Sequence, residues 1–216
     1  MAWESLGFTV VDGCTRIGTV EVRYASPGVP PATTPAATPR SPVAPSEVDT
    51  GLSSWALAGL ADLAGFDGTG TLDVDGLATT VVEPPPPAPS PRHANGSLSI
   101  DHVVVTTPDL ERTLDRLAEA GLELRRTRDA GEHLQAFYRI GEAILEVVGP
   151  HQPTSDGPAR LWGFVCTVED LDATAVLLGD RLGPQRDAVQ PGRRIATVTG
   201  AAGVGVPLAF MTPDRR

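Results

Sequence analysis

The chain has 216 residues, a formal net charge of −10 and no lysine, so all 17 of its basic side chains are arginines. The absence of lysine excludes Schiff-base and P-loop lysine chemistry. An acidic chain without a clustered basic stretch also matches neither nucleic acid nor an anionic membrane surface as a partner.

Targeting and membrane signals are equally weak. No apolar run approaches the roughly 20 residues that span a bilayer, and the first residues lack the basic region of a signal peptide. The two cysteines, Cys14 and Cys166, are too few for a disulfide framework. We therefore expect a soluble, cytoplasmic protein.

The distribution of proline indicates that the N-terminal part of the chain is loosely built. Of the 21 prolines, 13 fall within residues 27–45 and 84–91, and such stretches favour extended connectors over helices or central strands. Short strand-like pieces occur at 19–25 and 52–60, and residues 65–76 are rich in turn formers. We predict that residues 1–97 form an N-terminal extension of short strands with Pro-rich linkers at 27–50 and 84–97.

Stronger periodicity begins at residue 98. A β-branched strand is expected over 98–106, followed by a helix that Thr107 caps, with Pro108 at its first position and Gly121 after its end. Strands are expected over 122–126, 134–140 and 143–148, with a tight turn at Gly141-Glu142 joining the last two.

The same order then repeats, which indicates a duplication. We expect a strand over 161–168, a helix over 169–183, a weak edge strand over 184–189 and a closing hairpin from 193–199 and 206–211. The fold class predicted is α+β, with paired βαβββ modules at 98–150 and 159–214 forming one domain over 98–216.

Two stretches carry a family resemblance. The segments IDHVVVTTPDLERTL (100–114) and GEAILEVVGP (141–150) are similar to the vicinal oxygen chelate (VOC) superfamily of glyoxalases, bleomycin-resistance proteins and dioxygenases. The resemblance covers residues 98–216. It implies that two modules pair into a cupped mixed sheet with helices outside and a ligand cavity inside. It also implies a divalent metal ion held by His or Gln on the first strands and Glu on the fourth strands.

Carried over residue by residue, the resemblance gives metal-ligand positions to His102 and Glu146, and a catalytic, proton-moving role to Glu146. The second module departs from this pattern: aligning the two modules places Gly163 opposite His102 and Ala209 opposite Glu146. Neither side chain can bind a metal, so one chain holds fewer protein ligands than the three usual in catalytic zinc sites.

Strand alternation predicts the cavity lining. If His102 points inward, every second residue on its strand and on the fourth strand does so too. A two-residue turn at 141–142 would also pair Arg139 with Ile144 and Phe137 with Glu146. The expected lining is Val104, Thr106, Gln135, Phe137, Arg139, Ile144 and Val148.

Simpler interpretations stay open. Glu146 and Arg139 could form a structural salt bridge, and His102 could be a hydrogen-bonded core histidine. His93 falls in an expected loop, as do His133 and His151, where solvated side chains are expected. Cys166 faces the helix side of its strand, as a buried small hydrophobe would.

Two functions follow from these alternatives. The first is a VOC-type enzyme of the lyase, isomerase or dioxygenase kind, in which a divalent metal on His102 and Glu146 chelates a small substrate. A homodimer that pairs the first modules of two chains would supply the missing ligands. The second is metal-free binding of a small organic molecule, as in sequestration of an antibiotic, or a degenerate scaffold without a ligand.

Overall fold

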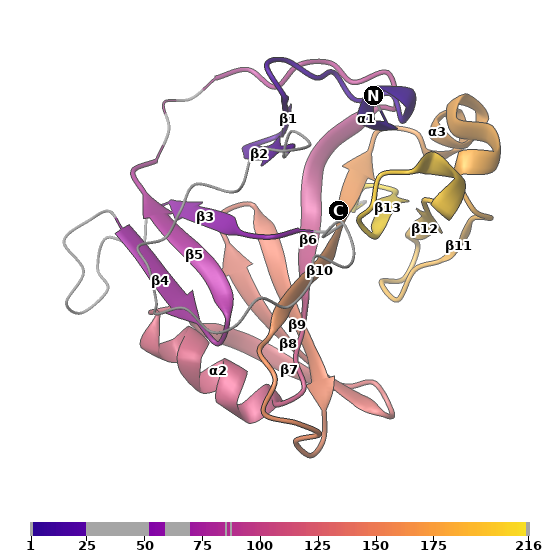
Figure 1. The fold of residues 1–216 in the computed structure, drawn as a ribbon. Coiled ribbons are helices and arrows are strands. Elements are labelled where there is room, and N and C mark those ends of the chain that lie inside the picture. The colour runs from indigo at the N-terminus through magenta and orange to yellow at the C-terminus, as the bar shows by residue number, and fades with distance from the viewer. Residues whose placement is uncertain (1, 25–51, 59–69, 85, 87, 215–216) are drawn as a thin grey trace, which may run out of the picture.

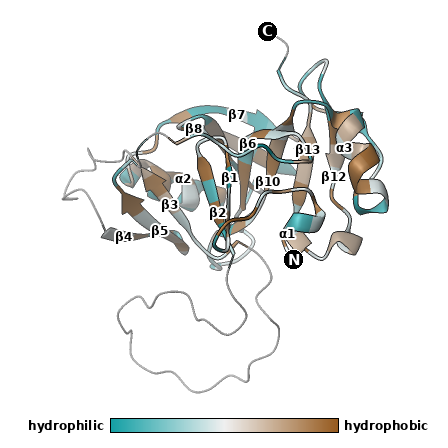
Figure 2. Cartoon of the chain, turned by 90° about the horizontal axis from the view of Figure 1, so that it is seen from above, coloured by the Kyte–Doolittle hydropathy of each residue, from teal (hydrophilic) through white to brown (hydrophobic). Residues whose placement is uncertain are grey.

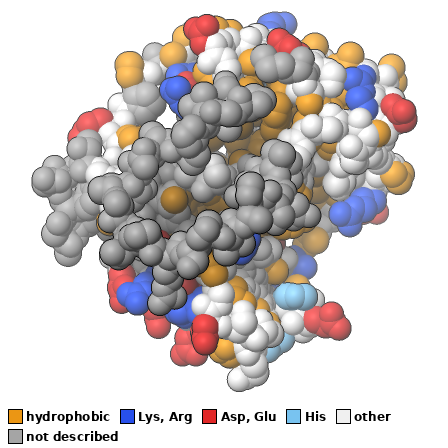
Figure 3. All heavy atoms as spheres, viewed as in Figure 1, with side chains coloured by type: hydrophobic (Ala, Val, Ile, Leu, Met, Phe, Trp, Pro, Cys, Tyr) orange, Lys and Arg blue, Asp and Glu red, His pale blue; other side chains and the backbone are white. Residues whose placement is uncertain are grey.

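The computed structural model describes residues 2–24, 52–58, 70–84, 86 and 88–214 (Figure 1). The predicted linker at 27–50 and residues 65–69 of the turn-rich piece at 65–76 lie outside these residues. Among the described helices, none is long and apolar enough to cross a membrane. On the face seen in Figure 3, acidic and basic side chains are interspersed around the rim and do not gather by sign.

Two βαβββ modules build one eight-stranded mixed sheet. The first contains β6 (Ser97–Thr106), α2 (Leu110–Glu119), β7 (Leu124–Asp129), β8 (His133–Ile140) and β9 (Ala143–Pro150). The second contains β10 (Arg160–Val168), α3 (Leu171–Leu178), a 3-10 turn (Gly179–Arg181), β11 (Arg186–Asp187), β12 (Arg194–Thr197), a second 3-10 turn (Gly200–Ala202) and β13 (Leu208–Met211).

The strand order β11-β12-β13-β10-β6-β9-β8-β7 relates the two halves as a repeat. In each module the first strand pairs in parallel with the fourth, and β6 and β10 join the modules as antiparallel neighbours. The α+β fold predicted from the duplicated pattern is thereby confirmed.

The start of α2 differs from the sequence prediction. Asp109, not Thr107, caps the helix, and its carboxylate accepts a hydrogen bond from the Arg112 amide at 3.1 Å. The Thr107 hydroxyl instead accepts from the Asp109 amide at 3.1 Å and so orders the turn before the helix. A serine, threonine or aspartate can each serve as a cap, and sequence alone ranks them poorly. Gly121 follows the helix with φ +76°, as expected for its end.

The N-terminal segment packs into the core of the second module. It comprises α1 (Ala2–Ser5), β1 (Cys14–Ile17) and β2 (Val20–Arg23), and its Leu6, Phe8 and Ile17 are almost fully buried. Their cluster includes Phe164 and Phe210 of the large sheet. Figures 1 and 2 both show α1 on the same side of the molecule as α3 and β13. The boundary at residue 97 stays a prediction, but the segment before it contributes to the same core as the repeat.

A second, three-stranded sheet lies against α2. Its strands are β3 (Trp55–Ala58), β4 (Gly70–Val74) and β5 (Leu77–Val82), in the order β3-β5-β4. Val74 and Leu77 are buried in the cluster that contains Leu110 and Leu117 of α2.

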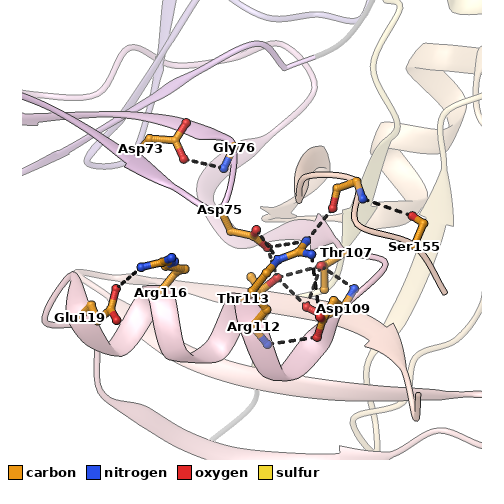
Figure 4. Close-up of polar contacts among 11 residues, drawn as sticks. Asp73, Asp75, Gly76, Thr107, Asp109, Arg112, Thr113, Arg116, Glu119 and Ser155 are labelled. Carbon is orange, nitrogen blue, oxygen red and sulfur yellow. Dashed lines mark hydrogen bonds and ion pairs between the residues drawn. The ribbon is translucent and has the colours of Figure 1, made fainter. Parts of the chain in front are cut away.

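One turn of the small sheet forms hydrogen bonds to α2 and to the linker that precedes β10 (Figure 4). The carboxylate of Asp75, between β4 and β5, accepts hydrogen bonds from Arg112 Nε at 2.7 Å and from Thr113 Oγ1 at 2.5 Å. The Asp75 carbonyl accepts from the amide of Ala159 at 2.8 Å. Asp75 therefore holds together the small sheet, α2 and the linker between the modules.

His93 corrects a second sequence prediction, because it is buried rather than solvated. Its Nδ1 accepts a hydrogen bond from the Thr9 amide at 3.1 Å, and its Nε2 lies 2.8 Å from the Arg16 carbonyl. These contacts require a neutral ring that carries its proton on Nε2. Burial lowers the pKa of His93 more than the hydrogen bond to Arg16 raises it. His133 and His151 are exposed, as expected.

Candidate functional site

The two faces of the large sheet differ in what covers them. On the first module's helix side, alternate residues such as Val105, Tyr138 and Leu145 are almost fully buried against α2. The opposite face carries the intervening residues, and we call it the site face. His102, Val104 and Thr106 of β6 and Ile144, Glu146 and Val148 of β9 lie on it, all half-buried.

The strand register confirms the predicted pairing. β8 places Phe137 opposite Glu146 and Arg139 opposite Ile144, and β6 places Val104 opposite Glu146. Each residue predicted to line the cavity therefore occupies the same face of three adjacent strands. Their roles as a site stay predictions.

A β-bulge brings a further carboxylate to this face. His102 pairs with Val165 and Ile100 pairs with Cys166, so Asp101 has no partner on β10 and the alternation of side chains is broken there. Asp101 Oδ1 lies 2.9 Å from His102 Nδ1. Its other oxygen accepts from Arg193 Nη2 at 2.6 Å and from Thr167 Oγ1 at 3.3 Å.

His102 and Glu146 form the centre of the polar cluster. With Nδ1 held by Asp101, Nε2 of His102 faces Glu146 Oε2 at 3.7 Å, which is longer than a hydrogen bond. Glu146 Oε1 accepts from Gln135 Nε2 at 2.7 Å. The oxygen of that amide, Gln135 Oε1, is buried without a hydrogen-bond partner. A ring nitrogen, a carboxylate and an unsatisfied amide oxygen thus lie on three neighbouring strands.

Burial and charge act differently on the two carboxyl groups. Burial would raise the pKa of Asp101, but the hydrogen bonds from His102 and Arg193 outweigh it and hold the pKa at about 2. Burial also raises the pKa of Glu146, and the positive charges of His102, Arg128 and Arg126 only partly offset this. Asp101 is therefore a fixed anion, whereas Glu146 is poised to accept a proton.

The second module holds no counterpart of this cluster. A Cβ built on Gly163 would lie 2.2 Å from the Pro207 carbonyl oxygen, so no side chain fits at the position that matches His102. The site face of this half instead carries the apolar Val165, Ala209 and Met211. The sequence predicted that the second module lacks a metal-binding side chain at the position of His102, and this lack has a steric cause.

Arg139 does not form the salt bridge considered from the sequence. Its Nε donates to the Gly141 carbonyl at 2.8 Å and closes its own hairpin turn, and the side chain is exposed. In the described part of the chain, the ionisable side chain within ion-pair distance of Glu146 is His102.

Sequence reasoning missed Asp101, Thr167 and Arg193. Alternation assigns Asp101 to the face opposite His102, and only the bulge reverses this. The adjacent Asp101-His102 pair was a visible signal, since a histidine ring is often oriented by a neighbouring carboxylate. Arg193 lies 92 residues away in sequence, and no local pattern links it to Asp101.

No family model and no curated protein matches the chain. Solved structures do. Methylmalonyl-CoA epimerase from Mycobacterium tuberculosis is 19% identical, with 56% of this chain and 91% of that chain covered and a TM-score of 0.46. A hypothetical protein from Bacillus halodurans is 16% identical, with coverages of 55% and 96% and a TM-score of 0.45.

A Streptomyces coelicolor methylmalonyl-CoA epimerase variant, in complex with 2-nitronate-propionyl-CoA, is 20% identical, with coverages of 54% and 97% and a TM-score of 0.43.

Proposed function

We propose that the chain binds a small organic molecule on the site face at His102 and Glu146, and that these residues act on it with a divalent metal ion. The observation that carries the proposal is the convergence of His102 Nε2, Glu146 and the unsatisfied Gln135 Oε1 on one surface. Polar groups that are half-buried and incompletely paired are costly unless a ligand or water completes them.

The side chains of the first module offer donor atoms that fit a divalent cation. His102 would bind through Nε2, Glu146 through a carboxylate oxygen and Gln135 through Oε1. Asp101 contacts Nδ1 of His102. A carboxylate commonly orients a metal-binding histidine by contacting its other ring nitrogen in this way. When bound, the ion would act as a Lewis acid on a carbonyl or enolate oxygen. The other carboxylate oxygen of Glu146 would accept or hold the proton that leaves the ligand.

Metal-free binding is the second candidate, and a specific observation favours it. Within the described residues, no group of three His, Cys, Asp or Glu side chains is placed to hold a metal. Gly163 also leaves no room for a ligand from the second half. In that case the polar cluster would recognise a ligand by hydrogen bonding alone. The apolar site face of the second module would pack against the remainder of the ligand.

Metal content separates the two candidates. Protein purified from metal-replete cells is assayed by elemental analysis and then titrated with Mn²⁺, Co²⁺ and Zn²⁺ by calorimetry. The metal-assisted proposal expects one site per chain, lost in His102→Ala and weakened in Gln135→Leu, but kept in the exposed control His133→Ala.

A different outcome supports the second candidate. If wild-type protein binds none of these ions but small-molecule screening raises its melting temperature, and His102→Ala abolishes that rise, the site binds its ligand without metal. Failure of both assays would overturn the proposed function.

A further inference from the structure

The edge strand β7 places two arginines beside the candidate site. The register pairs Arg126 with Phe137 and Arg128 with Gln135, and Phe137 in turn pairs with Glu146. Because residues two apart on a strand share a face, both guanidinium groups belong to the site face. Two cross-strand rows therefore run from an arginine on β7 to the polar cluster on β8 and β9.

Arg126 is held in a defined orientation. Its Cζ lies 4.5 Å from the centroid of the Phe137 ring, so the guanidinium sits over the ring face. The N–H donors of Arg126 lie in the plane of its guanidinium group. A stacked arginine is consequently prepared to donate two parallel hydrogen bonds to an oxyanion.

Both arginines also lack carboxylate partners. Within the described residues, no Asp or Glu oxygen lies within ion-pair distance of Arg126 or Arg128. The neighbouring Arg125 is different, because it pairs with Glu123 at 3.2 Å. Arg193 next to the site is likewise paired, with Asp101 at 2.6 Å. Among the residues that the structure describes, no carboxylate therefore neutralises Arg126 or Arg128.

We propose that Arg126, Arg128 and Phe137 form an oxyanion-binding subsite, which holds a carboxylate or phosphate group of the small molecule that reaches His102 and Glu146. This inference rests on the proposed function and narrows its ligand to a small organic acid or phosphate ester. Arg126 and Arg128 would anchor the charged end, and Phe137 would pack against the carbon skeleton between the anchor and Glu146.

The test measures anion binding by calorimetry with inorganic phosphate and malonate as probes, in low-salt buffer. We expect saturable binding of at least one probe, which identifies the preferred oxyanion. The dissociation constant should rise at least tenfold in Arg126→Gln and in Arg128→Gln, and binding should vanish in the double variant. Arg125→Gln removes the same charge one residue away, at a side chain that Glu123 already pairs with, and should bind like wild type.

Further variants keep this inference distinct from the proposed function. Anion binding should persist in His102→Ala, which removes the metal ligand, and should fall when the NaCl concentration is raised. Arg126→Lys should recover only part of the affinity, because lysine lacks the planar fork. Equal weakening by Arg125→Gln and Arg126→Gln, or unchanged affinity in the double variant, would overturn the subsite. Absence of metal binding with intact anion binding would remove only the metal-assisted function.

Discussion

Asp101 Oδ1 lies 2.9 Å from Nδ1 of its chain neighbour His102, at a bulge where the strand turns both side chains to one face. Asp101 is ionised, so this contact fixes the ring proton on Nδ1 and leaves Nε2 free to bind. Asp101→Asn should therefore change the tautomer balance of His102, which ¹⁵N NMR of the ring reports. It should also weaken metal binding by about 10–100-fold.

Arg193→Gln provides the matched control for this prediction. It removes the partner of the other Asp101 oxygen and leaves the contact to His102 in place. Its ring tautomer should match that of wild type. An unchanged His102 spectrum in Asp101→Asn would show that the carboxylate does not orient the ring.

Gly163 should resist substitution. A Cβ there would meet the Pro207 carbonyl oxygen at 2.2 Å, and backbone on both sides leaves little room to relax. We expect Gly163→Ala to lower the free energy of unfolding by about 3 kcal/mol, measured by urea denaturation. Gly200→Ala, where no atom lies within 4 Å of the added Cβ, should change it by less than about 0.5 kcal/mol. A stable Gly163→His variant with tighter metal binding would contradict the steric account.

Loss of Asp75 should loosen the small sheet. Its side chain is only 8% exposed and accepts from both Arg112 and Thr113. Asp75→Ala removes the buried charged partner of Arg112, while Thr113 Oγ1 keeps the Asp109 carbonyl as an acceptor at 2.9 Å. We therefore expect a loss of about 2–3 kcal/mol in the free energy of unfolding. Hydrogen exchange should accelerate most in β4 and β5. Asp115→Ala, an exposed position on the same helix, should leave both measurements unchanged.

His93 should make stability depend on pH. Its pKa is lowered in the folded chain, so the unfolded chain binds the proton more readily. The contribution of neutral His93 to the free energy of unfolding is then complete above pH about 6.5, the ordinary pKa of histidine. It is lost as the pH falls below that value. Urea unfolding midpoints at pH 5.5 and 7.5 should differ less in His93→Gln than in wild type. His151→Gln, which alters an exposed ring, should keep the wild-type difference, and an identical pH response in all three proteins would refute this origin.

The repeat was predictable because each module carries its own local signals. Periodic strands and an aspartate at the helix start occur in both modules. The pairing of Phe137 with Glu146 followed from the two-residue turn at Gly141-Glu142. These features depend on residues close in sequence.

The parts that escaped prediction depend on long-range packing. Strand β5 over Leu77–Val82 was not predicted, although the Asp75-Gly76 dipeptide before it favours a hairpin turn. Its other partner, β3, lies 24 residues before it in sequence. The bulge at Asp101 arises from pairing with β10, more than 60 residues on. The burial of His93 depends on Thr9 and Arg16, which precede it by more than 70 residues.

The packing of the N-terminal segment constrains the order of folding. Leu6, Phe8 and Ile17 share their buried cluster with Phe164 and Phe210, which a ribosome adds some 150 to 200 residues later. During synthesis these early apolar side chains lack Phe164 and Phe210 until most of the chain has emerged. The loop that must close is long, which slows docking of the segment. The residues made first are thus among the last to reach their final place.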